Sequence, residues 1–175
     1  MSVLVTIDIK DNVADVRFNR PEKMNAINPD MWKAIYEAGA SIENDVDVRA
    51  VVLSGNGRAF SAGLDMESMS GIGKSSRDDA PSSGDSLGAR DGKTFANAFQ
   101  RAAIIWKKLP MPVIGAIHGV AFGAGAQLAL GPDIRFVAPD VRFSILEIKW
   151  GLIPDVGITQ TLRDIVPLDV AKELT

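Results

Sequence analysis

Apolar and polar residues alternate in two short runs at the start of the chain. The runs cover residues 3–9 and 13–18, and the polar residues 10–12 separate them. A period of two places the apolar side chains of each run on one face, as in a half-buried strand, and the short polar gap suits a turn. The pattern therefore predicts a β-hairpin.

Helical spacing replaces the alternation after residue 28. Asn28 and Pro29 suit the N-cap and the first position of a helix. The apolar residues of one face then recur at helical intervals up to about Asn44, namely Met31, Ile35, Ala38 and Ile42. A compact apolar run at 48–53 predicts a buried strand after this helix. A strand, a helix and a strand in this order predict a β-α-β crossover with parallel strands.

A second crossover is predicted further along the chain. Residues 93–108 show helical spacing through Phe95, Phe99, Ala102 and Trp106, and the prolines at 110 and 112 end it. Residues 112–117 then read as a strand. Between the two crossovers, residues 71–91 are rich in Gly, Ser and charged residues and poor in large apolar ones, which predicts a mobile loop.

The C-terminal part is predicted to contain short elements. Residues 134–138 and 142–144 suit strands, residues 151–155 suit a loop, and helices are expected from about 157 and again from 168 to 175. The chain shows no internal repeat. We therefore expect residues 1–175 to form one α/β domain.

Composition and charge exclude several classes of function. A net charge of -3 without long basic runs argues against a nucleic-acid partner. The absence of cysteine and the single histidine argue against a disulfide framework and a metal site. The N-terminal residues do not resemble an export signal, so we expect a cytoplasmic protein. Residues 111–130 are nearly long enough to span a membrane, but Pro112, His118, Gln127 and several glycines argue against a continuous helix there.

Two glycine-containing turns are the leading candidates for chemistry. Residues 118–130 join an apolar run to a glycine-rich turn and then to good helix formers, and residues 60–65 form a similar turn after the earlier strand. If the two strands are parallel neighbours, both turns lie at one edge of the sheet, where backbone N–H groups can converge on a carbonyl oxygen. Plain turns that lead into helices are the alternative interpretation.

Other motifs in the chain are incomplete. Gly73, Lys74 and Ser75 match the end of a phosphate-binding loop, but Ser68 stands where its first glycine is required. The 123–125 turn resembles a dinucleotide-binding turn, but Leu128 replaces the third glycine. Ser61 and His118 leave a serine hydrolase as a minor alternative, although the first glycine of the nucleophile turn is missing.

Two acidic residues have apolar neighbours. Glu147 and Asp155 flank a bend and lie close in sequence to Ile145, Leu146, Trp150 and Ile153. Carboxyl groups in apolar surroundings are suited to proton transfer, whereas two solvated loop acids are the alternative. Asp65 reads by default as an acid in the first turn of a helix.

These segments together resemble the crotonase superfamily, the enoyl-CoA hydratase/isomerase family, over essentially the whole chain. The resemblance rests on residues 19–26, 58–65 and 119–130, and on Glu147 followed by residues 151–157. It implies an α/β fold of the ClpP/crotonase-like type, a spiral of ββα units instead of a plain doubly wound sheet. It also implies a homotrimer or a hexamer, and C-terminal trimerisation helices that are absent or incomplete here.

The resemblance also implies roles for particular residues. The backbone N–H groups of Ala62 and Ala124 would form an oxyanion hole for the carbonyl of an acyl-CoA thioester, and the loss of one such donor typically costs about 3–4 kcal/mol. Coenzyme A enters as part of the substrate, and neither a separate cofactor nor a metal is implied. The residues expected to contact it are Ala26, Ala62, Gly63, Leu64 and Asp65.

The acid residues differ from those of the family's hydratases. Those enzymes carry two glutamates, and here the first of the two positions is Gln127, an amide that cannot accept the proton of a water molecule. Asp155 stands where the family's dienoyl-CoA isomerases place a second acid. We therefore expect Glu147 and Asp155 to move a double bond. A hydratase that uses Glu147 alone and a non-catalytic CoA-binding or assembly subunit are the alternatives.

Overall fold

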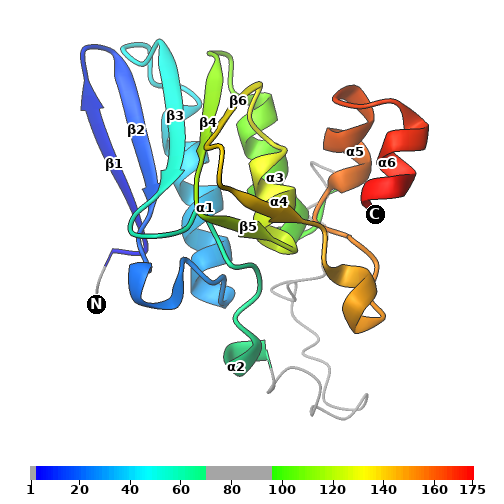
Figure 1. Cartoon of the computed structure of the whole chain (residues 1–175). Helices are drawn as coiled ribbons and strands as arrows, with labels where there is room; N and C mark the ends of the chain where they lie inside the picture. The colour runs from blue at the N-terminus through cyan, green and yellow to red at the C-terminus, as the bar shows by residue number, and fades with distance from the viewer. Residues whose placement is uncertain (1–2, 70–95) are drawn as a thin grey trace, which may run out of the picture.

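The computed structural model describes residues 3–69 and 96–175 (Figure 1). The loop predicted at 71–91 lies outside the described residues. The central element is a five-stranded sheet with the order β1-β2-β3-β4-β6. Its strands are β1 (Val5–Lys10), β2 (Val13–Phe18), β3 (Ala50–Gly55), β4 (Val113–Ile117) and β6 (Ile134–Val137).

Strand pairing confirms the hairpin and both crossovers. β1 runs antiparallel to β2, and the pairs β2–β3, β3–β4 and β4–β6 are parallel. Leu53 of β3 lies opposite Gly115 of β4, so the turns that follow these two strands leave the sheet at the same edge. This arrangement meets the condition on which the predicted convergence of the two turns depended.

Two capped helices pack beside the sheet and against each other. Helix α1 (Pro29–Ile42) begins after Asn28, whose side-chain oxygen accepts a hydrogen bond from the Met31 N–H at 2.8 Å. Helix α3 (Ala98–Lys108) begins with a capping box formed by Asn97 and Gln100. Such caps satisfy backbone N–H groups that the first helical turn leaves free.

Apolar side chains of the sheet, α1 and α3 form the main core. Its large members are fully buried or nearly so, and they include Phe18, Trp32, Ile35, Leu53, Phe60 and Trp106. The rings of Phe18 and Phe60 lie 5.1 Å apart between centroids. The core therefore anchors the segment that leads from β3 into the first candidate turn.

A small second sheet distinguishes the fold from a doubly wound domain. Strand β5 (Val120–Phe122) pairs in parallel with β7 (Arg142–Ser144), and the fully buried helix α4 (Ala124–Ala129) follows β5. The sequence did not predict β5 as a strand, because its three residues lie between glycines that favour a turn. The remaining short elements are η1 (Pro21–Lys23), α2 (Met66–Met69), η3 (Glu147–Trp150), α5 (Ile158–Thr161), η4 (Leu162–Asp164) and α6 (Leu168–Leu174).

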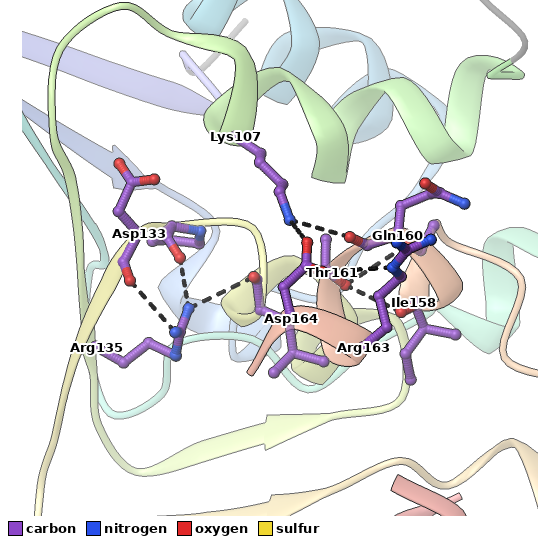
Figure 2. A network of polar contacts seen from close by, with 11 residues as sticks. Lys107, Asp133, Arg135, Ile158, Gln160, Thr161, Arg163 and Asp164 are labelled. Atoms are coloured by element: carbon purple, nitrogen blue, oxygen red, sulfur yellow. Dashed lines mark hydrogen bonds and ion pairs between the residues drawn. The ribbon is translucent and has the colours of Figure 1, made fainter. Parts of the chain in front are cut away.

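Polar contacts connect the C-terminal helices to α3 (Figure 2). The Lys107 ammonium lies 2.5 Å from a carboxylate oxygen of Asp164 and also donates to the Gln160 carbonyl at 3.1 Å. The hydrogen bond from Lys107 lowers the pKa of Asp164. At the start of β6, the Arg135 guanidinium donates to the carbonyls of Pro132 and Asp133. Burial lowers the pKa of this guanidinium.

Candidate active site

The two glycine-containing turns lie directly against each other. Backbone hydrogen bonds join Ser61 to β5, from the Ser61 N–H to the Val120 carbonyl and from the Phe122 N–H to the Ser61 carbonyl, each at 3.1 Å. A Cβ atom on Gly63 would lie only 2.6 Å from the Phe122 carbonyl oxygen and 3.7 Å from the Ala124 nitrogen. Gly63 has a φ of +91°, so both its backbone angle and its surroundings require glycine.

The hydrogen bonds of this turn correct one predicted donor. The Ala62 N–H donates to the Met24 carbonyl at 2.9 Å, so it is not free to bind a ligand. The Leu64 N–H, by contrast, has no acceptor within the described part of the chain, and the same is true of the Ala124 N–H at the start of α4. Leu64 and Ala124 therefore offer the free pair of donors. Sequence spacing could not distinguish Ala62 from Leu64, because the choice depends on Met24, which lies far away in the chain.

The residues predicted to contact coenzyme A lie together. The Ile27 N–H, next to Ala26, donates to the Gly63 carbonyl at 2.8 Å, and the Asp65 N–H donates to the Ile27 carbonyl at 3.0 Å. These bonds place Ala26 beside the 62–65 turn. Whether this surface contacts coenzyme A stays a prediction.

A buried ion pair holds the same two segments, and sequence reasoning missed it. The Arg20 guanidinium lies 2.9 Å from the Asp65 carboxylate and also donates to the Ala26 carbonyl at 2.7 Å. Asp65 directly precedes α2, close to the helix start that the sequence suggested, and it is buried against Arg20. The only sequence signal for this pair was that both residues lie in the motifs at 19–26 and 58–65.

A pocket of about 180 Å³ opens beside the two turns. Glu147 is the only charged residue among the described residues that line it. One wall carries the turn residues, and apolar side chains from α2 and the η3 region form the rest. The lining comprises Ala62, Gly63, Leu64, Met66, Phe122, Gly123, Ala124, Leu146, Glu147, Trp150 and Leu152.

The Glu147 carboxylate lies next to the second turn. Its Oε1 would be 3.6 Å from a Cβ atom built on Gly123, the residue that precedes Ala124. Gln127 Nε2 donates to this Oε1 at 2.6 Å. The other carboxylate oxygen, Oε2, is buried and accepts no hydrogen bond from the residues the structure describes. One oxygen is thus fixed by an amide, and the other is buried without a hydrogen-bond partner among the described residues.

Asp155 is placed differently from Glu147. Asp155 is exposed and is not among the residues that line the pocket. Its backbone carbonyl accepts a hydrogen bond from the Gln100 side chain at 3.1 Å. The structure thus brings Glu147, but not the Asp155 side chain, to the two turns, and a catalytic part for Asp155 stays a prediction.

The side chains of Ser61 and His118 do not form a catalytic pair. The buried Ser61 hydroxyl donates to the Asn25 carbonyl at 2.9 Å and accepts from the Gly63 N–H at 3.2 Å. The His118 Nε2 atom contacts the Gly57 carbonyl at 3.0 Å. Both side chains bond to backbone groups of loops and not to each other, which removes the support for a serine hydrolase.

Metal-binding clusters and membrane-spanning helices are both absent from the residues that the structure describes. Within 3–69 and 96–175, no group of three or more acidic and histidine side chains is arranged as metal ligands. No helix in these residues combines the length and the apolar character needed to cross a bilayer.

Comparisons with known proteins identify the family of this chain. Residues 8–175 match the family model described as enoyl-CoA hydratase/isomerase. A mitochondrial Delta(3,5)-Delta(2,4)-dienoyl-CoA isomerase from Mus musculus is 37% identical over 166 residues, which are 94% of this chain and 49% of that protein. A short-chain-enoyl-CoA hydratase from Clostridium acetobutylicum is 33% identical over 175 residues, which cover 97% of this chain and 60% of that protein.

Solved structures show the same fold. A putative enoyl-CoA hydratase from Streptomyces coelicolor superimposes with a TM-score of 0.80 at 32% identity, over 98% of this chain and 58% of that one. The chain thus spans about half to three fifths of the length of these relatives. The predicted crotonase-like fold is confirmed, and the chain belongs to the enoyl-CoA hydratase/isomerase family.

Proposed function

We propose that this chain binds an acyl-CoA thioester, stabilises its enolate and moves a carbon–carbon double bond, with Glu147 as the acid/base group. The observation that carries the proposal is the position of Glu147. It is the only charged residue among the described residues that line the pocket, and it lies beside the turn that holds the Ala124 N–H. A single carboxylate next to two free N–H groups suits proton removal next to a carbonyl.

The proposed reaction uses these groups in two steps. Glu147 Oε2 takes a proton from the carbon between the thioester carbonyl and the double bond, and negative charge moves to the thioester oxygen. The N–H groups of Leu64 and Ala124 bind that oxygen. The proton then returns at the far end of the former double bond, so the substrate and the product have the same atoms. Asp155 is proposed to assist this return, which requires its side chain to move toward the pocket.

The names of the relatives support the class of substrate. They include dienoyl-CoA isomerases and enoyl-CoA hydratases, both of which act on unsaturated acyl-CoA compounds. The apolar side chains of Met66, Leu146, Trp150 and Leu152 in the pocket suit an acyl group. No cofactor besides the coenzyme A of the substrate is proposed.

Gln127 favours isomerisation over hydration. Water addition by two acids needs a second carboxylate, and this position holds an amide whose two ends are both hydrogen-bonded to protein. Hydration by Glu147 alone is the second candidate. A homotrimer or hexamer and a cytoplasmic location stay predictions. The exposed Ile148 and Ile153, which do not line the pocket, support burial against a further protein surface.

Purified protein supplied separately with 2-enoyl-CoA, 3-enoyl-CoA and dienoyl-CoA tests the proposal. We expect double-bond shifts without net addition of water, detected by mass and absorbance, and a loss of turnover in Glu147→Gln. Hydration that depends on Glu147 would contradict the preference for isomerisation. Binding of acyl-CoA without turnover of any of the three would instead support a non-catalytic CoA-binding or assembly subunit.

A further inference from the structure

Gln127 is a fully buried polar side chain in an otherwise apolar helix. All six residues of α4 are buried, and the others are alanine, glycine or leucine. Burial of a primary amide is unfavourable unless its donor and acceptor groups are both satisfied. The partners of this amide therefore indicate why it is present.

The two ends of the amide bind two parts of the segment that follows β7. Its Nε2 donates to Glu147 Oε1 at 2.6 Å, and its Oε1 accepts from the Val156 N–H at 2.8 Å. A carboxylate only accepts hydrogen bonds and a backbone N–H only donates them. The partners therefore require the amide nitrogen to face Glu147 and the amide oxygen to face Val156. A carboxylate at this position would keep the Val156 bond but would meet Glu147 as a second acceptor.

The geometry points to Gln127 as a positioning residue that fixes Glu147 Oε1 and leaves Oε2 as the reacting atom. This inference rests on the proposed function, in which Glu147 carries the proton. One Nε2 hydrogen of Gln127 bonds to the Glu147 carboxylate and its Oε1 bonds to the backbone, so the amide is placed to hold the carboxylate. Through Val156, the same amide also fixes the backbone next to Asp155.

The hydrogen bond itself can be tested without substrate. In an NMR titration of the full chain, we expect one Nε2 proton of Gln127 to resonate away from the position of a free amide and to move as Glu147 ionises. The movement should be lost in Glu147→Gln, which cannot titrate. Nε2 protons that resonate as a free amide and do not change with pH would overturn the inference.

Kinetics test whether the bond matters for proton transfer. Gln127→Met keeps the volume but removes both polar ends, and we expect kcat to fall about 10- to 100-fold with a smaller change in KM. Leu128→Ala is the control, because the adjacent buried side chain packs in the main core and has no group that can hydrogen-bond Glu147. It should reduce stability without a comparable loss of kcat. Equal kcat losses in the two variants would overturn the inference.

A charged variant adds a readout that a purely structural role would not change. Gln127→Glu places a second carboxylate against Glu147, and two like charges at this distance resist joint ionisation. We expect the acidic limb of the kcat/KM profile to move to higher pH. An unchanged profile would overturn the inference.

A failure of the proposed function and a failure of the inference about Gln127 would give different results. A pH-dependent Nε2 resonance of Gln127 in a protein that turns over no enoyl-CoA would contradict the proposed function and support the hydrogen bond between Gln127 and Glu147. Turnover that requires Glu147 but is unaffected by Gln127→Met would support the proposed function and overturn the role of Gln127.

Discussion

The sheet region and the C-terminal segment of this molecule are packed very differently. In the sheet region, residues 3–69 and 96–144, strands and two long helices bury a large continuous core. The C-terminal segment, residues 145–175, contributes Ile145, Ile158 and Leu162 to a small cluster, which Ala126 and Leu130 at α4 complete. Large apolar side chains there stay exposed, such as Ile153 at 79% and Ile148 at 74%.

The candidate site joins these two regions. The free N–H groups belong to the sheet region, whereas Glu147 belongs to the C-terminal segment. A weakly packed segment does not by itself hold a carboxylate to the accuracy that proton transfer needs. Gln127 connects the two regions by hydrogen bonds to Glu147 and to the Val156 N–H, beside the small apolar cluster that also joins them.

The largest expected effect on the free energy of unfolding comes from the Arg20–Asp65 ion pair, which holds the 62–65 turn in the sheet region. Asp65→Asn removes the carboxylate charge from the largely buried Arg20 guanidinium, and breaking a buried pair costs up to about 3–5 kcal/mol. Urea unfolding should show this loss. Glu67→Gln, which breaks the exposed contact with Lys23, is the control and should unfold like the wild type. Equal behaviour of the two variants would contradict the importance of the buried pair.

The next effect concerns the turn that carries the Leu64 N–H. In Gly63→Ala, the new methyl group meets the Phe122 carbonyl and pushes the two turns apart, so kcat should fall about 10²- to 10³-fold, as for the loss of an oxyanion donor. Gly57→Ala is a matched control, because Gly57 also has positive φ but does not line the pocket. A similar fall in kcat for both would indicate a general effect of backbone strain.

Paired truncations measure the difference in packing directly. Leu53→Ala removes a fully buried side chain of β3 and should cost about 3 kcal/mol in the free energy of unfolding. Ile153→Ala removes an exposed side chain and should change it by less than about 0.5 kcal/mol. If Ile153→Ala proves as costly in urea unfolding, the C-terminal segment is covered by protein in solution, for example by a second copy of the chain.

The smallest expected effect is at the exposed contact between α3 and η4. The pKa of Asp164 is lowered by Lys107, so this contact stabilises the fold above the ordinary pKa of an aspartate and loses its effect as pH falls through the lowered value. Lys107→Met should therefore lower the melting temperature slightly at neutral pH, and the difference should shrink as pH falls below the ordinary pKa of an aspartate. A difference that persists in acid would show that packing, not charge, is responsible.

Local patterns predicted most of the fold. The alternation in β1 and β2, the N-cap at Asn28 and the helical spacing before Trp106 each depend on neighbours in sequence, and each was confirmed. Strand β5 was missed because three residues between glycines carry too little periodicity.

The site was predictable only in part, because its contacts join distant residues. The sequence indicated the two turns and Glu147. It could not show that Met24 occupies the Ala62 N–H, or that Gln127 binds Glu147, 20 residues away. Hydrogen-bond partners of this kind depend on tertiary packing, which spacing along the chain does not encode.

Hydrogen exchange into a saturated acyl-CoA in D₂O tests the central claim most directly. Enolate formation by Glu147 requires no double bond, so the wild type should incorporate deuterium at the carbon next to the thioester. Glu147→Gln should slow this incorporation about 10²- to 10⁴-fold while still binding the acyl-CoA. Incorporation at the wild-type rate in Glu147→Gln would contradict the account.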